Sequence, residues 1–161
     1  MKKIIILGDA MLNDLVKAIC HKHKVFHFFP KNEHQFNYVR EYFAMAITGT
    51  HPPIGQKEKE LKIGEMLTDF LGDTKDEDIL YISAYEVPLR KDGLTAIDFY
   101  EKFLGGDKAC IVLTKTTDGT HLNQVLHFIG TTGNRRQITR KMKTGDFQKK
   151  LDAEMSSLLT P

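Results

Sequence analysis

Short apolar runs alternate along this chain with stretches in which apolar residues recur at helical spacing. The first run spans residues 3–7, and after it apolar residues return at positions 12, 15, 16, 19 and 20. This alternation is typical of an α/β domain with a partly parallel sheet. It predicts a three-layer fold in which helices cover a mixed, mostly parallel sheet.

Later segments extend the pattern and indicate how the sheet ends. Further strands are expected at residues 25–29, 79–84 and 109–114, and further helices at residues 57–71, 94–104 and 146–159. Asp118 and Gly119 form a strong hairpin signal between the strand at 109–114 and a second apolar run at 125–129. The sequence therefore predicts that the sheet finishes in an antiparallel hairpin.

Length and composition indicate one folded domain over residues 1–161. The chain has 161 residues, of which 41% are hydrophobic and 27% charged, as in ordinary globular domains. No apolar run approaches the roughly 18 residues of a membrane span, so no membrane partner is expected. The apolar start is too short for a signal peptide and ends at Asp9, which predicts a cytoplasmic location. Cys20 and Cys110 lie in apolar patterns, which favours buried thiols over a disulfide.

The formal net charge of +2 hides an uneven distribution along the chain. Residues 133–150 contain seven basic residues and the single acid Asp146, so this segment carries +6 and the rest of the chain −4. Such a segment favours an anionic partner. Nucleic acid, nucleotide phosphates and an acidic protein all fit, and a charged surface loop and helix without a partner is the alternative.

The first predicted turn is a candidate phosphate site. Gly8 and Asp9 lie between the strand at 3–7 and the following helix, whose N-terminus offers free N–H groups and a partial positive charge. No second glycine follows, so both common nucleotide-binding fingerprints are absent. A plain strand-to-helix turn remains the alternative.

Acidic residues at two places are candidates for Mg²⁺ chemistry, since Mg²⁺ takes one or two carboxylates together with substrate phosphates. Glu58, Glu60 and Glu65 lie on the helix expected at 57–71, with Lys62 among them. A solvated helix face with an ion pair is the alternative for this group. Glu86 follows the central strand, at the carboxyl end where α/β proteins bind ligands.

Residues 111–113, the Asp118-Gly119 turn and residues 127–133 follow one another as strand, turn and strand. With the strand–turn–helix opening, this order resembles the inosine-triphosphate pyrophosphatase and Maf group of house-cleaning nucleotide pyrophosphatases. The resemblance implies Mg²⁺-dependent hydrolysis of a nucleoside triphosphate. It also implies that Lys62 contacts phosphate and that Glu58 or Glu60 binds the metal ion.

The sequence departs from that group's motifs in three places, one of which is that the group's C-terminal Ser-His-Arg element is not found. The group's Ser/Thr-x-Asn-x-x-Lys phosphate turn is replaced by residues 7–12, which read Leu-Gly-Asp-Ala-Met-Leu. After the central strand, only Glu86 represents the group's acidic residues. The resemblance therefore allows two predictions: an active pyrophosphatase, or a relative that kept the fold and lost the standard catalysis.

These patterns predict a protein that binds a nucleotide or another phosphorylated ligand at the carboxyl edge of its sheet. The alternative is a non-catalytic adaptor that uses residues 133–150 to bind nucleic acid or an acidic partner. Formation of a homodimer is left open. The expected site comprises Glu86 and Lys62 as catalytic residues, Gly8, Asp9, Arg135 and Arg136 as phosphate-binding residues, and Glu58 and Glu60 as ligands of Mg²⁺.

Overall fold

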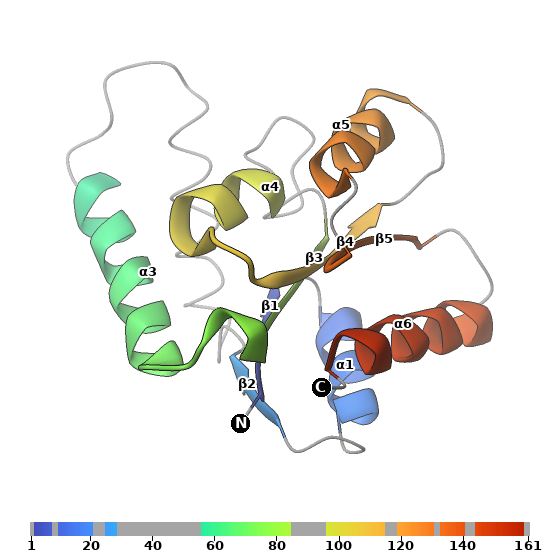
Figure 1. The fold of residues 1–161 in the computed structure, drawn as a ribbon, viewed down its shortest axis with the longest axis horizontal. Coiled ribbons are helices and arrows are strands. Elements are labelled where there is room, and N and C mark those ends of the chain that lie inside the picture. The colour runs from blue at the N-terminus through green and yellow to red at the C-terminus, as the bar shows by residue number, and fades with distance from the viewer. Residues whose placement is uncertain are drawn as a thin grey trace.

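Five parallel strands form the centre of the protein. A computed structural model describes residues 2–7, 10–20, 25–28, 56–84, 96–114, 119–130, 133–140 and 144–159. In these ranges one sheet has the strand order β2-β1-β3-β4-β5, and every neighbouring pair is parallel. Helices lie on both faces of the sheet (Figure 1), so the predicted three-layer α/β fold is confirmed.

Strands and helices alternate along the described part of the chain. The elements are β1 (Lys2–Leu7), α1 (Ala10–Cys20), β2 (Val25–Phe28), α3 (Gln56–Leu71), η1 (Asp76–Asp78), β3 (Ile79–Ala84), α4 (Ala96–Phe99), η2 (Tyr100–Leu104), β4 (Ala109–Thr114), α5 (Gly119–Ile129), β5 (Arg135–Thr139) and α6 (Thr144–Leu159). The η2 segment is a π-helical turn, closed by a 2.7 Å hydrogen bond from the Gly105 N–H to the Tyr100 carbonyl. None of the described helices is long and apolar enough to cross a membrane.

The predicted antiparallel hairpin is wrong. Gly119 begins α5, and the apolar run at 125–129 belongs to that helix instead of a strand. Leu122, Val125 and Ile129 recur at intervals of three and four, which places them on one helical face, and Val125 is completely buried. The last strand is β5, which pairs in parallel with β4. A parallel pair needs a crossover connection, and α5 supplies it.

The two central strands are buried over their whole length. Every residue of β3 and of β4 is buried. Their sequences are continuous apolar runs because helices cover both faces of a parallel sheet, so neither face can alternate with polar residues. β5 is an edge strand, and of its five residues only Ile138 is buried.

Each face of the sheet has its own hydrophobic core. Residues of α3, α4, η2 and α5 pack on one face, and residues of α1 and α6 pack on the other. Cys110 lies in the first core and Cys20 in the second, so the two thiols stay free, as the sequence predicts. Burial raises the pKa of each thiol to about 12.

The strand order contains one point at which the winding of the chain reverses. β1 lies between β2 and β3, so successive connections leave it towards opposite edges of the sheet. In doubly wound sheets of this order, ligands bind outside the carboxyl ends of the strands at the reversal point. The carboxyl ends of β1, β3, β4 and β5 therefore define the edge at which a ligand site is expected.

Candidate functional site

The carboxyl ends of the central strands carry the buried polar side chains. Ser83 is fully buried and Thr114 is 3% exposed, and in the described part of the chain they are the buried polar side chains besides the tyrosines. Ser83 is the penultimate residue of β3, and Thr114 is the last residue of β4. Ser83 lies opposite Val112, two residues before Thr114, so both hydroxyls share the sheet face covered by α3, α4 and α5.

A side-chain amide on β5 joins this polar edge. Thr114 and Thr139 are register partners, and Gln137 lies two residues before Thr139 on the same face. The Gln137 Nε2 group donates hydrogen bonds to Thr114 Oγ1 at 2.8 Å and to Thr139 Oγ1 at 3.0 Å. The Arg140 N–H donates to the Thr114 carbonyl at 2.7 Å and closes the ladder between the two strands. One amide thus fixes two hydroxyl groups at the carboxyl end.

The β3 part of this edge is linked to α4. The Tyr81 hydroxyl donates to the Ala96 carbonyl at 3.2 Å, and the Ser83 hydroxyl donates to the Ala84 carbonyl at 2.8 Å. Burial raises the pKa of Tyr81 well above its usual value, so the phenol stays a neutral donor. The bond from Tyr81 to Ala96 fixes the start of α4 beside β3.

Several of the predicted site residues cannot be compared with this edge directly. Gly8, Asp9 and Glu86 lie outside the described residues. Glu58 and Glu60 lie in the first turns of α3, in a stretch whose side chains are not described. Lys62 is exposed on the same helix. Their assignment to Mg²⁺ and phosphate stays a prediction.

Arg135 and Arg136 lie at the opposite end of the sheet from the polar edge. Both belong to the amino end of β5. The Arg135 guanidinium donates to the Phe128 carbonyl at 2.8 Å and lies 4.3 Å from the centre of the Phe128 ring. Arg136 pairs with Glu154 of α6 at 2.9 Å. The structure therefore separates the two arginines from the carboxyl edge and uses both in contacts within the protein.

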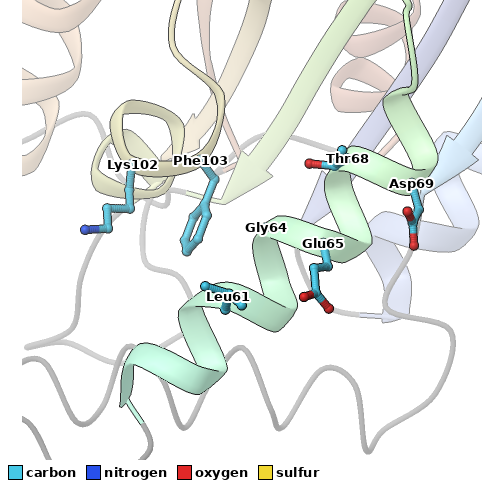
Figure 2. A pocket seen from close by; sticks show the side chains of 7 residues that line it. All are labelled: Leu61, Gly64, Glu65, Thr68, Asp69, Lys102 and Phe103. Carbon is cyan, nitrogen blue, oxygen red and sulfur yellow. The ribbon is translucent and has the colours of Figure 1, made fainter.

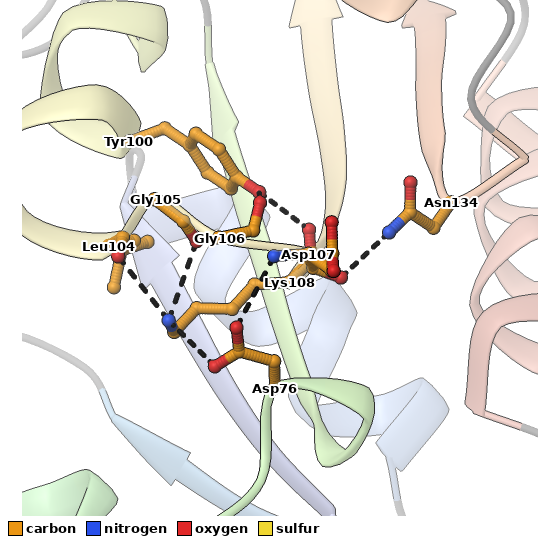
Figure 3. Close-up of polar contacts among 8 residues, drawn as sticks. All are labelled: Asp76, Tyr100, Leu104, Gly105, Gly106, Asp107, Lys108 and Asn134. Carbon is orange, nitrogen blue, oxygen red and sulfur yellow. Dashed lines mark hydrogen bonds and ion pairs between the residues drawn. The ribbon is translucent and has the colours of Figure 1, made fainter.

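A cluster of polar contacts at the amino end is structural (Figure 3). The Lys108 ammonium lies 2.9 Å from the Asp76 carboxylate and donates to the Leu104 carbonyl at 3.3 Å. The Asp107 N–H donates to the other Asp76 oxygen, and Asn134 donates to the Asp107 carbonyl at 2.7 Å. These contacts tie η1 to the start of β4 and to the turn before β5. Lys108 and the Asp107 N–H hold the pKa of Asp76 below its usual value.

A groove lies between α3 and η2 (Figure 2). Its volume is about 830 Å³, and it is lined by Leu61, Gly64, Glu65, Thr68, Asp69, Lys102 and Phe103. Glu65 and Asp69 are one helical turn apart on α3, so the described lining of the groove carries two carboxylates and one ammonium group, that of Lys102. This excess of negative charge disfavours phosphate in the groove.

The basic segment 133–150 folds as a strand and the first part of a helix. Besides the two β5 arginines, Arg140 lies 5.9 Å from the centre of the Phe147 ring, and Lys150 pairs with Glu154 at 3.6 Å. Several of its charges are therefore engaged by neighbouring side chains. Binding of nucleic acid or of an acidic partner by this segment stays a prediction.

The sequence interpretation missed Thr114, Gln137 and Thr139. The signal was present, because Gln137 and Thr139 alternate with the apolar Ile138, as expected for an edge strand with one buried face. The many lysines and arginines around these residues favoured a surface loop instead.

No protein-family model matches the chain, and a comparison with curated proteins finds no similar sequence. The resemblance to the nucleotide pyrophosphatases therefore stays a prediction. One segment on which it rests, the apolar run at 125–129, is helical and not a strand.

Proposed function

We propose that the protein binds a small phosphorylated ligand, such as a nucleotide, at the carboxyl edge of its sheet. One observation carries the proposal: Ser83 and Thr114, the buried aliphatic hydroxyls of the described chain, both lie at this edge and on one face. A core packed only for stability favours apolar side chains at such positions, since buried hydroxyls lose hydrogen bonds to water. Hydroxyl groups at an edge where a ligand binds can form hydrogen bonds with that ligand.

The topology supports the same edge independently of the side chains. The chain reverses its winding between β1 and β3, and ligands of doubly wound sheets bind outside the carboxyl ends at this point. The parallel connection from β4 to β5 places the start of α5 at the same end of the sheet. Free N–H groups and a partial positive charge at a helix N-terminus favour phosphate.

A stability screen tests the proposal. Ligands that bind only the folded state raise the melting temperature by mass action. We expect nucleoside phosphates or sugar phosphates to raise the melting temperature, while the matching nucleosides and sugars have no effect. If no phosphorylated compound raises it, the proposal is wrong.

Backbone amide NMR then locates the bound ligand. Addition of the best phosphorylated compound should shift the amide signals of Leu7, Ser83 and Thr114, at the carboxyl ends of their strands. The amides of Asp107 and Lys108, at the amino end, should shift less. Larger shifts at the amino end would place the ligand elsewhere.

Hydrolysis is a separate question from binding. In the part of the chain that the structure describes, no three His, Cys, Asp or Glu side chains gather as a metal site. The proposal concerns binding, and no step of it uses Mg²⁺. Release of phosphate or pyrophosphate from nucleoside triphosphates with Mg²⁺ tests the sequence prediction of hydrolysis, and unchanged activity in Glu86→Gln would remove that residue from it.

A further inference from the structure

Gln137 contacts two hydroxyl groups whose donors no described residue accepts. A threonine hydroxyl has one O–H donor and two acceptor lone pairs, and a glutamine amide has two N–H donors. The Gln137 amide donates to both threonine oxygens, at 2.8 Å to Thr114 and 3.0 Å to Thr139, and so uses one lone pair of each. Within the described residues, neither hydroxyl donates its own proton to a protein group.

The burial of this arrangement makes the unused donors informative. Thr114 is 3% exposed, so bulk water scarcely reaches its hydroxyl. A buried donor without an acceptor is unfavourable, and native proteins rarely keep one without a reason. Thr139 and Gln137 are partly exposed, so the two threonine hydroxyls can be reached from solvent on the side of the edge strand β5. A ligand atom that reaches the pair from solvent would supply the missing acceptor.

We infer that Thr114 and Thr139 form a pair of hydroxyl donors, held by Gln137, that binds an oxygen-rich anionic group such as phosphate. The inference rests on the proposed function and names the residues that recognise the phosphoryl group. An anionic oxygen accepts hydrogen bonds and donates none, which matches two hydroxyls whose donors are unused. The site lies at the carboxyl ends of β4 and β5. Arg140 directly follows β5 at this end.

Inorganic phosphate is the probe, and the methyl signals of isotope-labelled threonines report where it binds. Phosphate should shift the methyl signals of Thr114 and Thr139 in a saturable manner. The methyl signal of Thr68, which lies on α3 in the groove of Figure 2, should stay in place. Titration with sodium chloride separates binding from an effect of ionic strength.

Gln137→Glu tests the direction of the hydrogen bonds. A carboxylate at this position accepts hydrogen bonds from both threonine hydroxyls, so it occupies both donors and adds a negative charge beside them. We expect phosphate binding to be lost. Gln148→Glu is the matched control, because it adds the same charge at an exposed position of α6, on the other face of the sheet, and should preserve binding.

Thr139→Val provides a second test at the edge strand, where a small change of shape is tolerated. Loss of one hydrogen bond to a charged group should weaken phosphate binding roughly ten- to a hundredfold. Thr68→Val is the control and should bind phosphate as the wild type does.

The outcomes separate this inference from the proposed function. If phosphorylated compounds bind the wild type but Gln137→Glu and Thr139→Val bind them with unchanged affinity, the inference is overturned and the proposed function stands. If phosphate binds but shifts other methyl signals, the threonine pair is also overturned. If no phosphorylated compound binds the wild type, both fail together.

Discussion

The two ends of the parallel sheet carry polar groups of different kinds. At the amino end, ion pairs join Lys2 to Asp78 at 3.1 Å and Lys108 to Asp76 at 2.9 Å. At the carboxyl end, the buried polar groups are neutral hydroxyls, and Thr114 keeps a donor that no described residue accepts. Groups that satisfy one another stabilise the fold, whereas groups with unused donors are available to a ligand.

The amino end also closes the connections between the elements. The Lys3 ammonium donates to the carbonyls of Phe70 and Leu71, at 2.7 and 3.0 Å. These are the last carbonyls of α3, which lack partners inside the helix, and a cation there also interacts favourably with the helix dipole. Substitutions at the amino end should therefore change stability, and substitutions at the carboxyl end should change binding.

Gly106→Ala at the amino end should have the largest effect on stability. Gly106 has a φ of 65°, and an added Cβ would collide with Asp76 Oδ2. The alanine adds left-handed backbone strain and displaces the carboxylate from Lys108. We expect a loss of about 2 kcal/mol in the free energy of unfolding, measured with urea.

Gly72→Ala is the matched control for this prediction. Gly72 has a φ of 55°, and nothing lies within 4 Å of an added Cβ. It should lose only the backbone contribution of about 1 kcal/mol. Equal losses in the two variants would show that the contact with Asp76 contributes nothing.

Arg135→Met asks whether an arginine at the amino end serves stability or binding. The substitution removes the hydrogen bond to the Phe128 carbonyl and the contact with the Phe128 ring. We expect a loss of about 1–2 kcal/mol in the free energy of unfolding. The affinity for phosphorylated compounds, measured by calorimetry, should not change. A fall in affinity without a loss of stability would support the sequence prediction that Arg135 binds phosphate and would contradict the contrast between the two ends.

The sequence determines the central part of this fold clearly. The strands at 79–84 and 109–114 are predicted to the residue, because fully buried parallel strands are continuous apolar runs. The end of the sheet is mispredicted, because the Asp118-Gly119 pair and a short apolar run imitate a hairpin. β5 is not predicted, because Arg135 and Arg136 are typical of a surface loop. In the structure their side chains pack against α5 and α6.

The candidate site follows from the sequence only in its location. A predicted parallel sheet implies a ligand at its carboxyl edge. Which residues would contact that ligand depends on the strand order and on the register of neighbouring strands, and neither can be read from the sequence. Thr114 and Thr139 are 25 positions apart in the sequence and become partners only through the pairing of β4 with β5.

Ser83→Ala at the carboxyl end should change stability less than either substitution at the amino end. The Ser83 hydroxyl donates to the adjacent Ala84 carbonyl, so the variant removes this local bond and one buried polar atom. These effects oppose each other, and we expect a change below about 1 kcal/mol in the free energy of unfolding. A loss as large as that of Gly106→Ala would show that the carboxyl end is also built for stability.

The smallest expected effect is the pH dependence due to Asp76. The Lys108 ammonium and the Asp107 N–H lower the pKa of this carboxyl in the folded protein, so its contribution to stability is present above the ordinary aspartate pKa of about 3.9. It is lost as the pH falls below that value and through the lowered pKa. The carboxylate is about half exposed, so the contribution stays below about 1 kcal/mol.

Asp76→Asn isolates this contribution from other acids. The difference in the free energy of unfolding between wild type and variant should be positive at neutral pH and should shrink below about pH 4. High salt should reduce it, because the pair is partly exposed. A difference that stays constant as the carboxyl becomes protonated would mean that the loss arises from altered packing, and the ion pair would then not account for the stability of the amino end.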